Sequence, residues 1–485
     1  MKGSPVITRM TRKTASAIAG TILLPLLCLA AGAPLPANAQ VGQDGLQAAE
    51  EAALLATLDS LARAHVDHER VAGVSVAVIR GPETLLMGGY GEVDLEWDVP
   101  TPQDGDANYE IGSMTKQFTA AAILRLVEEG AVDLEADITR YLPDYDTRGH
   151  AIPVRRLLDH TSGIRGYTEM PFFGEISVRK LPRDTLVTLV EAHPLDFEPG
   201  TALIYSNSAY FLLGLIIEKA SGKSYAEYVE QELFEPAGMA DSHYCSERAV
   251  RENRAHGYDS GPDGLLRAAY LDHTWPYSAG SLCSTVADLV RWNQALHGGE
   301  ILSVDSYRAM ITPRPLKDGT PTRYAMGLLV TGEGRHRVIS HGGGINGFLS
   351  DGRYYPEEDL IVVALQNSTG PRGPGALTRE LAQAVLGPAP EPPATTFRGD
   401  LAELTGRYTG AARGRTLTLE VRRDGDALIF AVEGTDQEIR PTHLEGLTWG
   451  QGLLRLWFIR KNGEIAELRL DEGSSHLVLE REEGK

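Results

Sequence analysis

The chain has 485 residues, 42% hydrophobic and 23% charged, so it is long enough for more than one domain and a sizeable core. This composition excludes a disordered or collagen-like chain. The 46 Lys and Arg against 66 Asp and Glu leave a formal net charge of −20, which argues against nucleic acid or an anionic membrane as partner. Three cysteines exclude a disulfide scaffold and a Cys-rich metal site. We therefore expect His, Ser and carboxylates to carry any chemistry.

The N-terminus has the pattern of an export signal. Four basic residues among the first 13 precede an uncharged apolar run over residues 15–33, and a small-x-small pattern follows at residues 37–39. A retained membrane anchor is the alternative, since the run is nearly long enough to span a bilayer, but a glycine and a proline interrupt it. We predict a signal peptide over 1–39 that is cleaved after Ala39, no stable membrane insertion afterwards, and a periplasmic or secreted location.

A proline-rich segment divides the mature chain. Four of the seven residues 387–393 are prolines, which favours an extended spacer. We place a first domain over residues 40–387, a linker over 388–396 and a second domain over 397–485. Cys245 and Cys283 remain after signal cleavage, and whether they pair stays open at this point.

The first domain mixes helical and strand patterns. Hydrophobic periodicity and turn residues predict strands over 71–79, 353–355 and 360–366, and helices over 120–129, 210–220 and 376–386. Strands at both ends of a mostly helical stretch indicate an α+β fold, with an antiparallel sheet flanked by helices and a helical subdomain.

The second domain reads as all-β. Alternating apolar residues predict strands over 417–421, 428–432, 454–458 and 465–470, and Asn462-Gly463 is a strong hairpin signal between the last two. Several short strands at this spacing without a helical period are typical of a small β-barrel or sandwich.

Ser113-Met114-Thr115-Lys116 is the first segment with chemical potential. Gly112 precedes it and an apolar helical run follows, so Ser113 and Lys116 should lie one turn apart on one face at a helix N-terminus. A serine hydroxyl is a poor nucleophile unless a neighbour takes its proton. A buried lysine can be that neighbour, because burial lowers its pKa. Taken alone, the pattern is more often a capped helix with a surface lysine.

Two further segments add polar groups. In Tyr205-Ser206-Asn207, the first and third side chains share a face of an extended segment. A phenol can relay a proton and an amide can hold a carbonyl, although Asn207 could instead cap the following helix and Tyr205 pack in the core. Residues 340–348 contain three consecutive glycines, which mark close approach of a ligand or backbone, or else a tight hairpin.

With these segments in this order, the chain resembles the class C β-lactamase and low-molecular-weight penicillin-binding family of serine hydrolases. That family includes D-aminopeptidases, D,D-peptidases and esterases. Residues 157–164 and 279–289 are similar to its Leu-Leu-x-His-Thr-Ser-Gly and Ala-Gly-Gly-x-x-Ser-Thr segments. The resemblance covers roughly residues 50–386. It implies a β-lactamase/transpeptidase-like fold, followed here by a lipocalin-like barrel as in several peptidase-like members.

The resemblance also implies roles in an acyl-enzyme mechanism. Ser113 would be the acylated nucleophile and Lys116 its proton acceptor. Tyr205 would shuttle a proton to the leaving group, and Asn207 would hold the substrate's amide. The main-chain N–H groups of Ser113 and Gly344 would form the oxyanion hole. How Lys116 and Tyr205 share the role of base stays open.

The chain departs from the β-lactamase pattern at residues 341–343. Where those enzymes have Lys-Thr-Gly, this sequence has His341-Gly342-Gly343, which we expect to bind the substrate. A histidine is largely neutral above its pKa of about 6.5 and would hold an anion weakly. The change favours a peptidase or an esterase over a dedicated β-lactamase.

The other histidines lack the spacing of a metal site. We interpret His65, His68 and His160 as structural, and His273, beside Asp272, as a candidate for supporting the site. No metal or cofactor is expected.

The sequence therefore predicts an exported serine hydrolase that acts on small peptide, amide or ester substrates. A true class C-type β-lactamase is the alternative. From a different class, a non-catalytic penicillin-binding-like receptor or scaffold is disfavoured by the intact motifs. The expected partner is a small-molecule or peptide substrate, while the physiological substrate, the role of the β-domain and the oligomeric state stay open.

Overall fold

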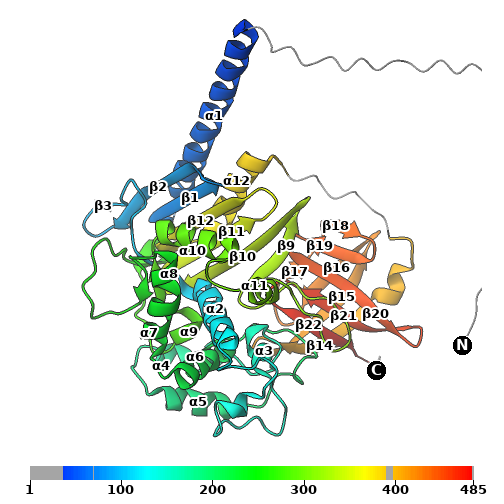
Figure 1. Ribbon diagram of the computed structural model, residues 1–485. Helices are drawn as coiled ribbons and strands as arrows, with labels where there is room; N and C mark the ends of the chain where they lie inside the picture. Colours follow the sequence, from blue (N-terminus) through cyan, green and yellow to red (C-terminus); the bar gives the residue numbers. More distant parts are fainter. Residues whose placement is uncertain (1–36, 69, 389–396, 483–485) are drawn as a thin grey trace, which may run out of the picture. The chain divides into compact units, whose positions relative to one another are not determined.

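The structure is a computed structural model that describes residues 37–68, 70–388 and 397–482 (Figure 1). The predicted signal peptide and proline-rich linker lie almost entirely outside these residues. Within the described ranges, no helix combines the length and the hydropathy that a membrane crossing requires.

A seven-stranded antiparallel sheet organises the first part of the chain, in the order β3-β2-β1-β12-β11-β10-β9. Its strands are β1 (Gly73–Arg80), β2 (Glu83–Asp94), β3 (Val99–Pro100), β9 (Leu329–Glu333), β10 (His336–Ile345), β11 (Phe348–Tyr355) and β12 (Leu360–Gln366). The central strands β1 and β12 are buried along nearly their whole length, which explains their continuous apolar sequence. The three strands predicted in this part of the sequence overlap β1, β11 and β12.

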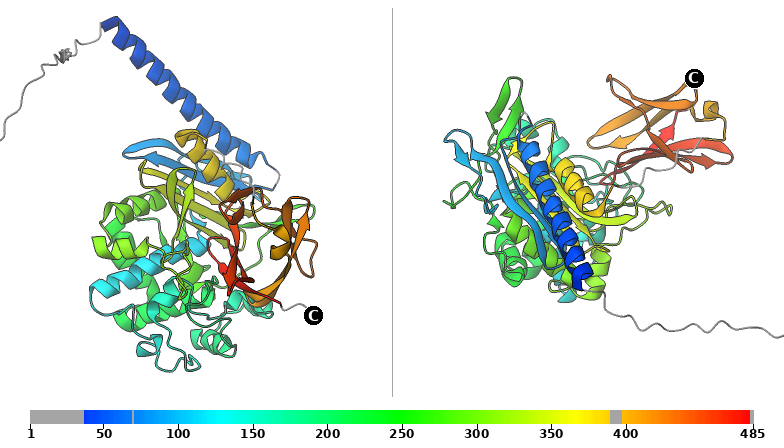
Figure 2. Two further views of the ribbon diagram at one scale, coloured as in Figure 1. Left: turned by 90° about the vertical axis from the view of Figure 1, so that its right-hand side faces the viewer. Right: turned by 90° about the horizontal axis from the view of Figure 1, so that it is seen from above.

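Helices cover both faces of this sheet. Alternate residues of β1 point to opposite sides, so Val76 packs on one face with Leu58 of α1 (Ala37–Val66) and Leu381 of α12 (Pro374–Leu386). Figure 2 shows α12 beside the second half of α1 on this face. Ala77 belongs to the larger core on the other face.

The helices of the helical subdomain pack around the larger core. Its central helices are α2 (Thr115–Glu128), which is buried over most of its length, and α6 (Asn207–Ser221). The remaining helices are α3 (Val154–Leu158), α4 (Phe173–Ile176), α5 (Arg183–Glu191), α7 (Tyr225–Val229), α8 (Glu235–Ala237), α9 (Tyr277–Gly280), α10 (Val286–Gly298) and α11 (Val304–Met310). Short 3₁₀ turns include η1 (Gly112–Met114) and η3 (Tyr167–Glu169), and Glu230–Phe234 forms a π-helical turn.

Two small three-stranded sheets are separate from the central sheet. One has the order β4-β8-β5, formed by β4 (Tyr109–Glu110), β8 (Leu282–Ser284) and β5 (His243–Tyr244). The other has the order β13-β6-β7, formed by β13 (Ser368–Thr369), β6 (Tyr258–Gly261) and β7 (Gly264–Arg267). Cys245 and Cys283 form a disulfide with their Cα atoms 5.2 Å apart, which answers the question that the sequence left open.

The C-terminal part is a nine-stranded antiparallel sheet in the order β17-β16-β15-β14-β22-β21-β20-β19-β18. The strands are β14 (Gly406–Ala412), β15 (Arg415–Asp424), β16 (Ala427–Val432), β17 (Glu438–Ile439), β18 (His443–Glu445), β19 (Thr448–Gln451), β20 (Leu454–Lys461), β21 (Glu464–Asp471) and β22 (His476–Arg481). Asn462 and Gly463 both have positive φ at the β20–β21 turn, as their hairpin signal predicts. The prediction of an α+β fold followed by a small barrel-like β-domain is confirmed. The nine-stranded sheet of this domain is curled into a half-barrel, with β17 and β18 at its two edges.

The β21–β22 turn contacts the segment that leads into α6. Leu203 and His476 exchange two backbone hydrogen bonds, of 3.1 and 2.7 Å. Arg323 forms an ion pair with Asp471 at 2.8 Å. These contacts bring the C-terminal sheet next to Tyr205, two residues beyond Leu203.

Candidate active site

Ser113 lies in η1, immediately before α2. Gly112 has a φ of +51°, and a Cβ added there would lie 2.9 Å from backbone atoms of Gly344 on β10. A larger residue would therefore be both strained and in collision. The glycine allows the chain to turn sharply into the helix while the backbones of η1 and β10 remain in contact.

The terminal nitrogen of Lys116 lies within hydrogen-bond distance of three polar atoms. Its Nζ lies 3.1 Å from Ser113 Oγ, 2.8 Å from Asn207 Oδ1 and 2.8 Å from the carbonyl oxygen of Ala279. The side chain is completely buried. Burial and the nearby Arg413 guanidinium hold the pKa of Lys116 well below its usual range.

Tyr205 and Asn207 flank Lys116 from the start of α6. The helix is capped by Ser206, whose Oγ accepts from the Ala209 N–H, so Asn207 is free of the capping role that its position allowed. Asn207 Nδ2 donates to Thr168 Oγ1 at 3.0 Å. The Lys116 Nζ is 4.7 Å from the centroid of the Tyr205 ring.

The Tyr205 phenol is protonated at neutral pH. Burial raises its pKa above the ordinary value, and an interaction with the Ser113 side chain only partly opposes this shift. The phenol is therefore available as a proton donor close to the serine.

The glycines of β10 allow two backbones to meet. A Cβ added at Gly343 would lie 2.0 Å from the carbonyl oxygen of Ile111, and Ser350 Oγ donates to that same oxygen at 2.8 Å. Residues 342–344 lie in β10, and the tight hairpin that was the alternative follows them, because Ile345 pairs with Phe348 across Asn346 and Gly347. Their backbone lies beside η1, which carries Ser113.

His341 is buried and neutral at physiological pH. Burial and the neighbouring Lys116 lower its pKa to about 4. Nδ1 lies 2.5 Å from the Gly342 carbonyl oxygen, and Nε2 lies 3.0 Å from the Tyr324 hydroxyl. Since a carbonyl only accepts, Nδ1 carries the proton and Nε2 accepts from Tyr324.

His160 has a closer relation to the site than its structural interpretation suggested. Its ring centroid is 4.3 Å from that of Tyr205 and 4.7 Å from that of Tyr324, and Nδ1 accepts from the Ser206 N–H at 3.2 Å. Burial lowers its pKa well below the usual value. His160 thus packs as a neutral ring that holds the Tyr205 segment. His65 is buried elsewhere, with Nε2 2.7 Å from Gln366 Oε1.

A cleft of about 580 Å³ opens over Ser113. The predicted residues Tyr205, Asn207 and 341–344 line it. Four lining residues come from the C-terminal sheet, and no motif in the sequence signalled them: Arg413, Leu453, Glu472 and Ser474. A second pocket of about 130 Å³ adjoins Ser113 on the side lined by Tyr167, Phe173, Leu271 and Ile345.

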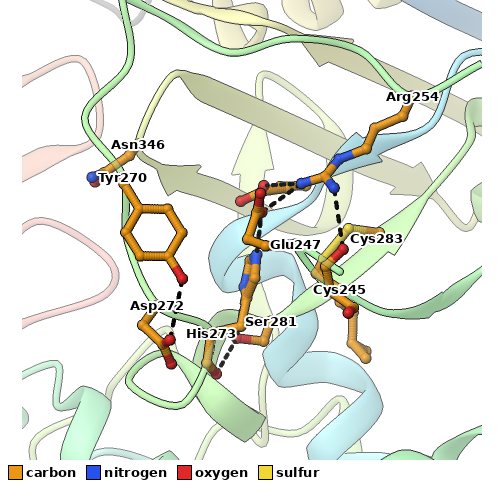
Figure 3. A network of polar contacts seen from close by, with 12 residues as sticks. Cys245, Glu247, Arg254, Tyr270, Asp272, His273, Ser281, Cys283 and Asn346 are labelled. Carbon is orange, nitrogen blue, oxygen red and sulfur yellow. Dashed lines mark hydrogen bonds and ion pairs between the residues drawn. A yellow bond between two sulfur atoms is a disulfide. The ribbon is translucent and has the colours of Figure 1, made fainter. Parts of the chain in front are cut away.

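His273 belongs to an ion-pair network next to the disulfide (Figure 3). Its Nε2 lies 3.6 Å from Glu110 and 3.5 Å from Glu247, and its Nδ1 is 3.2 Å from Ser281 Oγ. Burial lowers the pKa of His273, but the Glu110 and Glu247 carboxylates outweigh this effect and raise the pKa to about 9. Glu110 on β4 is three residues before Ser113, so the network anchors the strand that leads to the serine.

Two groups of described residues have the spacing of metal ligands: Asp94, Glu96 and His256, and Glu110, Glu247 and His273. In the second group Arg254 donates to Glu247 at 2.5 Å and lies 3.5 Å from Glu110. The positive charges of Arg254 and the protonated His273 therefore already neutralise the negative charges of Glu110 and Glu247.

Comparison with known proteins identifies the class. The chain matches a β-lactamase family profile, and relatives named D-aminopeptidase and D-amino acid amidase are serine hydrolases, so the protein is a serine hydrolase. The sequence profile of the family described as Beta-lactamase matches residues 58–386, so the chain belongs to that family.

Individual relatives cover much of the chain. Penicillin-binding protein 4* of Bacillus subtilis (strain 168) is 30% identical over 308 residues, which are 60% of this chain and 67% of the relative. A D-aminopeptidase of Gluconobacter oxydans (strain 621H) is 26% identical over 386 residues, 78% of this chain and 69% of the relative. The solved D-amino acid amidase of Ochrobactrum anthropi SV3, complexed with L-phenylalanine amide, has a TM-score of 0.60 at 29% identity, covering 69% of this chain and 98% of that one.

Proposed function

We propose that this protein is an exported hydrolase that cleaves small peptide, amide or ester substrates through an acyl-Ser113 intermediate, with amides of D-amino acids as the preferred class. The observation that carries the proposal is the environment of Lys116. A neutral amine has two N–H groups and one lone pair. Asn207 Oδ1 and the Ala279 carbonyl oxygen accept the two N–H groups, so the lone pair is left for the Ser113 hydroxyl.

In this proposal Lys116 is the general base and Tyr205 the proton donor. The lowered pKa of Lys116 favours its neutral amine, and the raised pKa of Tyr205 disfavours the phenolate. The two environments therefore assign opposite roles to the two groups.

The reaction then proceeds in two halves. As Ser113 Oγ attacks the substrate carbonyl carbon, its proton passes to Lys116 Nζ. The carbonyl oxygen becomes an oxyanion held by the main-chain N–H groups of Ser113 and Gly344, each worth about 3 kcal/mol in related chemistry. When the C–N bond breaks, the leaving amine takes a proton through the Tyr205 hydroxyl, which Lys116 replenishes. Water attacks the acyl ester by the reverse route and releases the carboxylic acid.

Substrate recognition follows from the walls around Ser113. Asn207 and the backbone of residues 341–343 would hold the substrate's amide. The neutral His341 provides no fixed charge for a carboxylate, which favours amides over β-lactams. The pocket of about 130 Å³ beside Ser113 has room for one apolar side chain. The names of the D-aminopeptidase and D-amino acid amidase relatives support the D configuration.

We also propose that residues 1–39 direct export and that the mature enzyme has a hydrolase domain over 40–387, a linker over 388–396 and a β-domain over 397–485. The disulfide between Cys245 and Cys283 supports an oxidising compartment.

A substrate panel with the full mature chain tests the proposal. We expect D-phenylalanine amide to be hydrolysed with a kcat/KM at least tenfold above those of L-phenylalanine amide and nitrocefin. Ser113→Ala should abolish this turnover, whereas Ser260→Ala, a change at an exposed serine on β6, should retain it. Preferred turnover of nitrocefin would instead establish the β-lactamase alternative. A fluorophosphonate probe that leaves Ser113 unlabelled would refute the acyl-serine mechanism.

A further inference from the structure

The β14–β15 hairpin of the C-terminal sheet reaches the catalytic cleft. Its turn consists of Arg413 and Gly414, between the end of β14 and the start of β15. A Cβ added at Gly414, where φ is +65°, would lie 2.4 Å from the Glu169 side chain on η3. The Arg413 guanidinium pairs with the Glu169 carboxylate at 2.5 Å. The hairpin tip is therefore pressed against the wall of the cleft that contains Ser113.

The same arginine contacts Tyr205, which also lies next to Lys116. The Arg413 Cζ lies 5.3 Å from the centroid of the Tyr205 ring, and Lys116 Nζ lies 4.7 Å from that centroid. The Arg413 guanidinium and the Lys116 nitrogen are thus at most about 10 Å apart, with the Tyr205 ring in contact with both.

We propose that Arg413 is a positioning residue of the active site supplied by the C-terminal domain: its guanidinium fixes the Tyr205 ring, and its charge keeps Lys116 in the neutral form that takes the Ser113 proton. This inference rests on the proposed function, because it assumes that Lys116 is the base.

Four titratable groups close to Lys116 carry no charge at neutral pH. Burial lowers the pKa values of His160 and His341, so both rings are neutral. Burial raises the pKa values of Tyr205 and Tyr210, so both phenols keep their protons.

Two charged groups act on Lys116 in opposite directions. Beyond the effect of burial, Arg413 lowers the pKa of Lys116 and Glu169 raises it. The rest of the cleft wall carries further charged residues: Glu333, Asp351, Arg353, Arg379 and Glu472. Of these, Arg353 pairs with both Glu333 and Asp351.

Removing the Arg413 charge leaves Glu169 uncompensated, so the ammonium form of Lys116 is favoured and its pKa rises. Two unit charges about 10 Å apart interact by about one pH unit at an effective dielectric constant of 20. The Arg413 side chain is 45% exposed, and solvent screening reduces the expected shift to about half a pH unit.

The test is the pH dependence of Ser113 labelling by a fluorophosphonate in the full mature chain, followed by mass spectrometry. This readout needs no knowledge of the natural substrate. Arg413→Gln should move the acidic limb of the pH profile of labelling to higher pH by about half a pH unit. Labelling at a given pH on that limb should then be about threefold slower. Glu169→Gln should move it down by a similar amount. Both shifts should shrink in 1 M NaCl.

Two matched variants separate charge from packing. Arg415→Gln removes the same charge two residues along the hairpin and should leave the limb in place. Arg413→Lys keeps the charge without the planar guanidinium, so it should retain the limb and lower the maximal rate.

The outcomes distinguish the inference from the proposed function. A labelled wild type in which Arg413→Gln shifts the limb no more than Arg415→Gln refutes the role of Arg413 alone. Shifts of the same sign in Arg413→Gln and Glu169→Gln refute it as well. A wild type that is not labelled refutes the proposed function and, with it, this inference.

Discussion

Asn207→Asp is the change that most directly probes the base. The substitution is nearly isosteric and places a carboxylate oxygen 2.8 Å from Lys116 Nζ, where the amide oxygen now lies. At an effective dielectric constant of 20, that contact favours the ammonium form by up to about 6 kcal/mol, or about four pH units. The cost of burying the carboxylate reduces this value, and we expect the pKa of Lys116 to rise by at least two units.

The assay is kcat/KM for D-phenylalanine amide between pH 5 and pH 10. Because Lys116 must be neutral to take the Ser113 proton, a raised pKa moves the acidic limb to higher pH. Activity at pH 7 should fall by about 100-fold or more and recover toward alkaline pH. Asn207→Ala is the control: it removes the same amide without adding charge, so it should lower kcat/KM at all pH values and leave the limb in place.

An acidic limb that stays within half a pH unit of the wild-type position in Asn207→Asp would show that Lys116 is not the group that titrates. The same conclusion would follow if Asn207→Ala and Asn207→Asp had identical pH profiles.

Four further predictions test other parts of the site and fold. Ser113→Ala should leave the thermal unfolding midpoint unchanged and reduce turnover to below about 1% of wild type on every substrate; residual activity above that level would contradict the covalent mechanism. Tyr205→Phe should lower kcat more than tenfold, or by over about 1.4 kcal/mol, with little change in KM for an amide; an unaffected kcat would remove the phenol from proton transfer. His341→Lys adds a positive charge to the cleft and should shift the kcat/KM ratio toward carboxylate-bearing substrates by about ten- to a hundredfold, measured on matched amide and carboxylate pairs. Replacing Cys245 and Cys283 by Ser should lower the free energy of unfolding by about 2–4 kcal/mol in denaturant titrations, because the disulfide closes a loop with a sequence separation of 38; equal stability under oxidising conditions would contradict the pairing.

The spacing of residues along the sequence is sufficient to predict that Ser113 and Lys116 lie together. Ser113 and Lys116 are three residues apart at the start of a helix, and helical geometry alone places them on one face. The apolar runs of β1 and β12 and the Asn462-Gly463 turn likewise follow from residue pattern, because backbone preferences and burial act over short stretches.

What the tertiary structure decided is the environment of those groups. The carbonyl of Ala279, the ring of His160 and the guanidinium of Arg413 come from segments far apart in the chain. Their approach depends on how whole surfaces pack, which no local pattern encodes. Burial then sets the chemistry: it lowers the pKa of Lys116, and it lowers that of His341 to about 4, below the value that its residue type predicts. The sequence by itself therefore determined which groups could react, and the folded chain determined their protonation states, because desolvation and long-range charge arise only when distant segments enclose the same cleft.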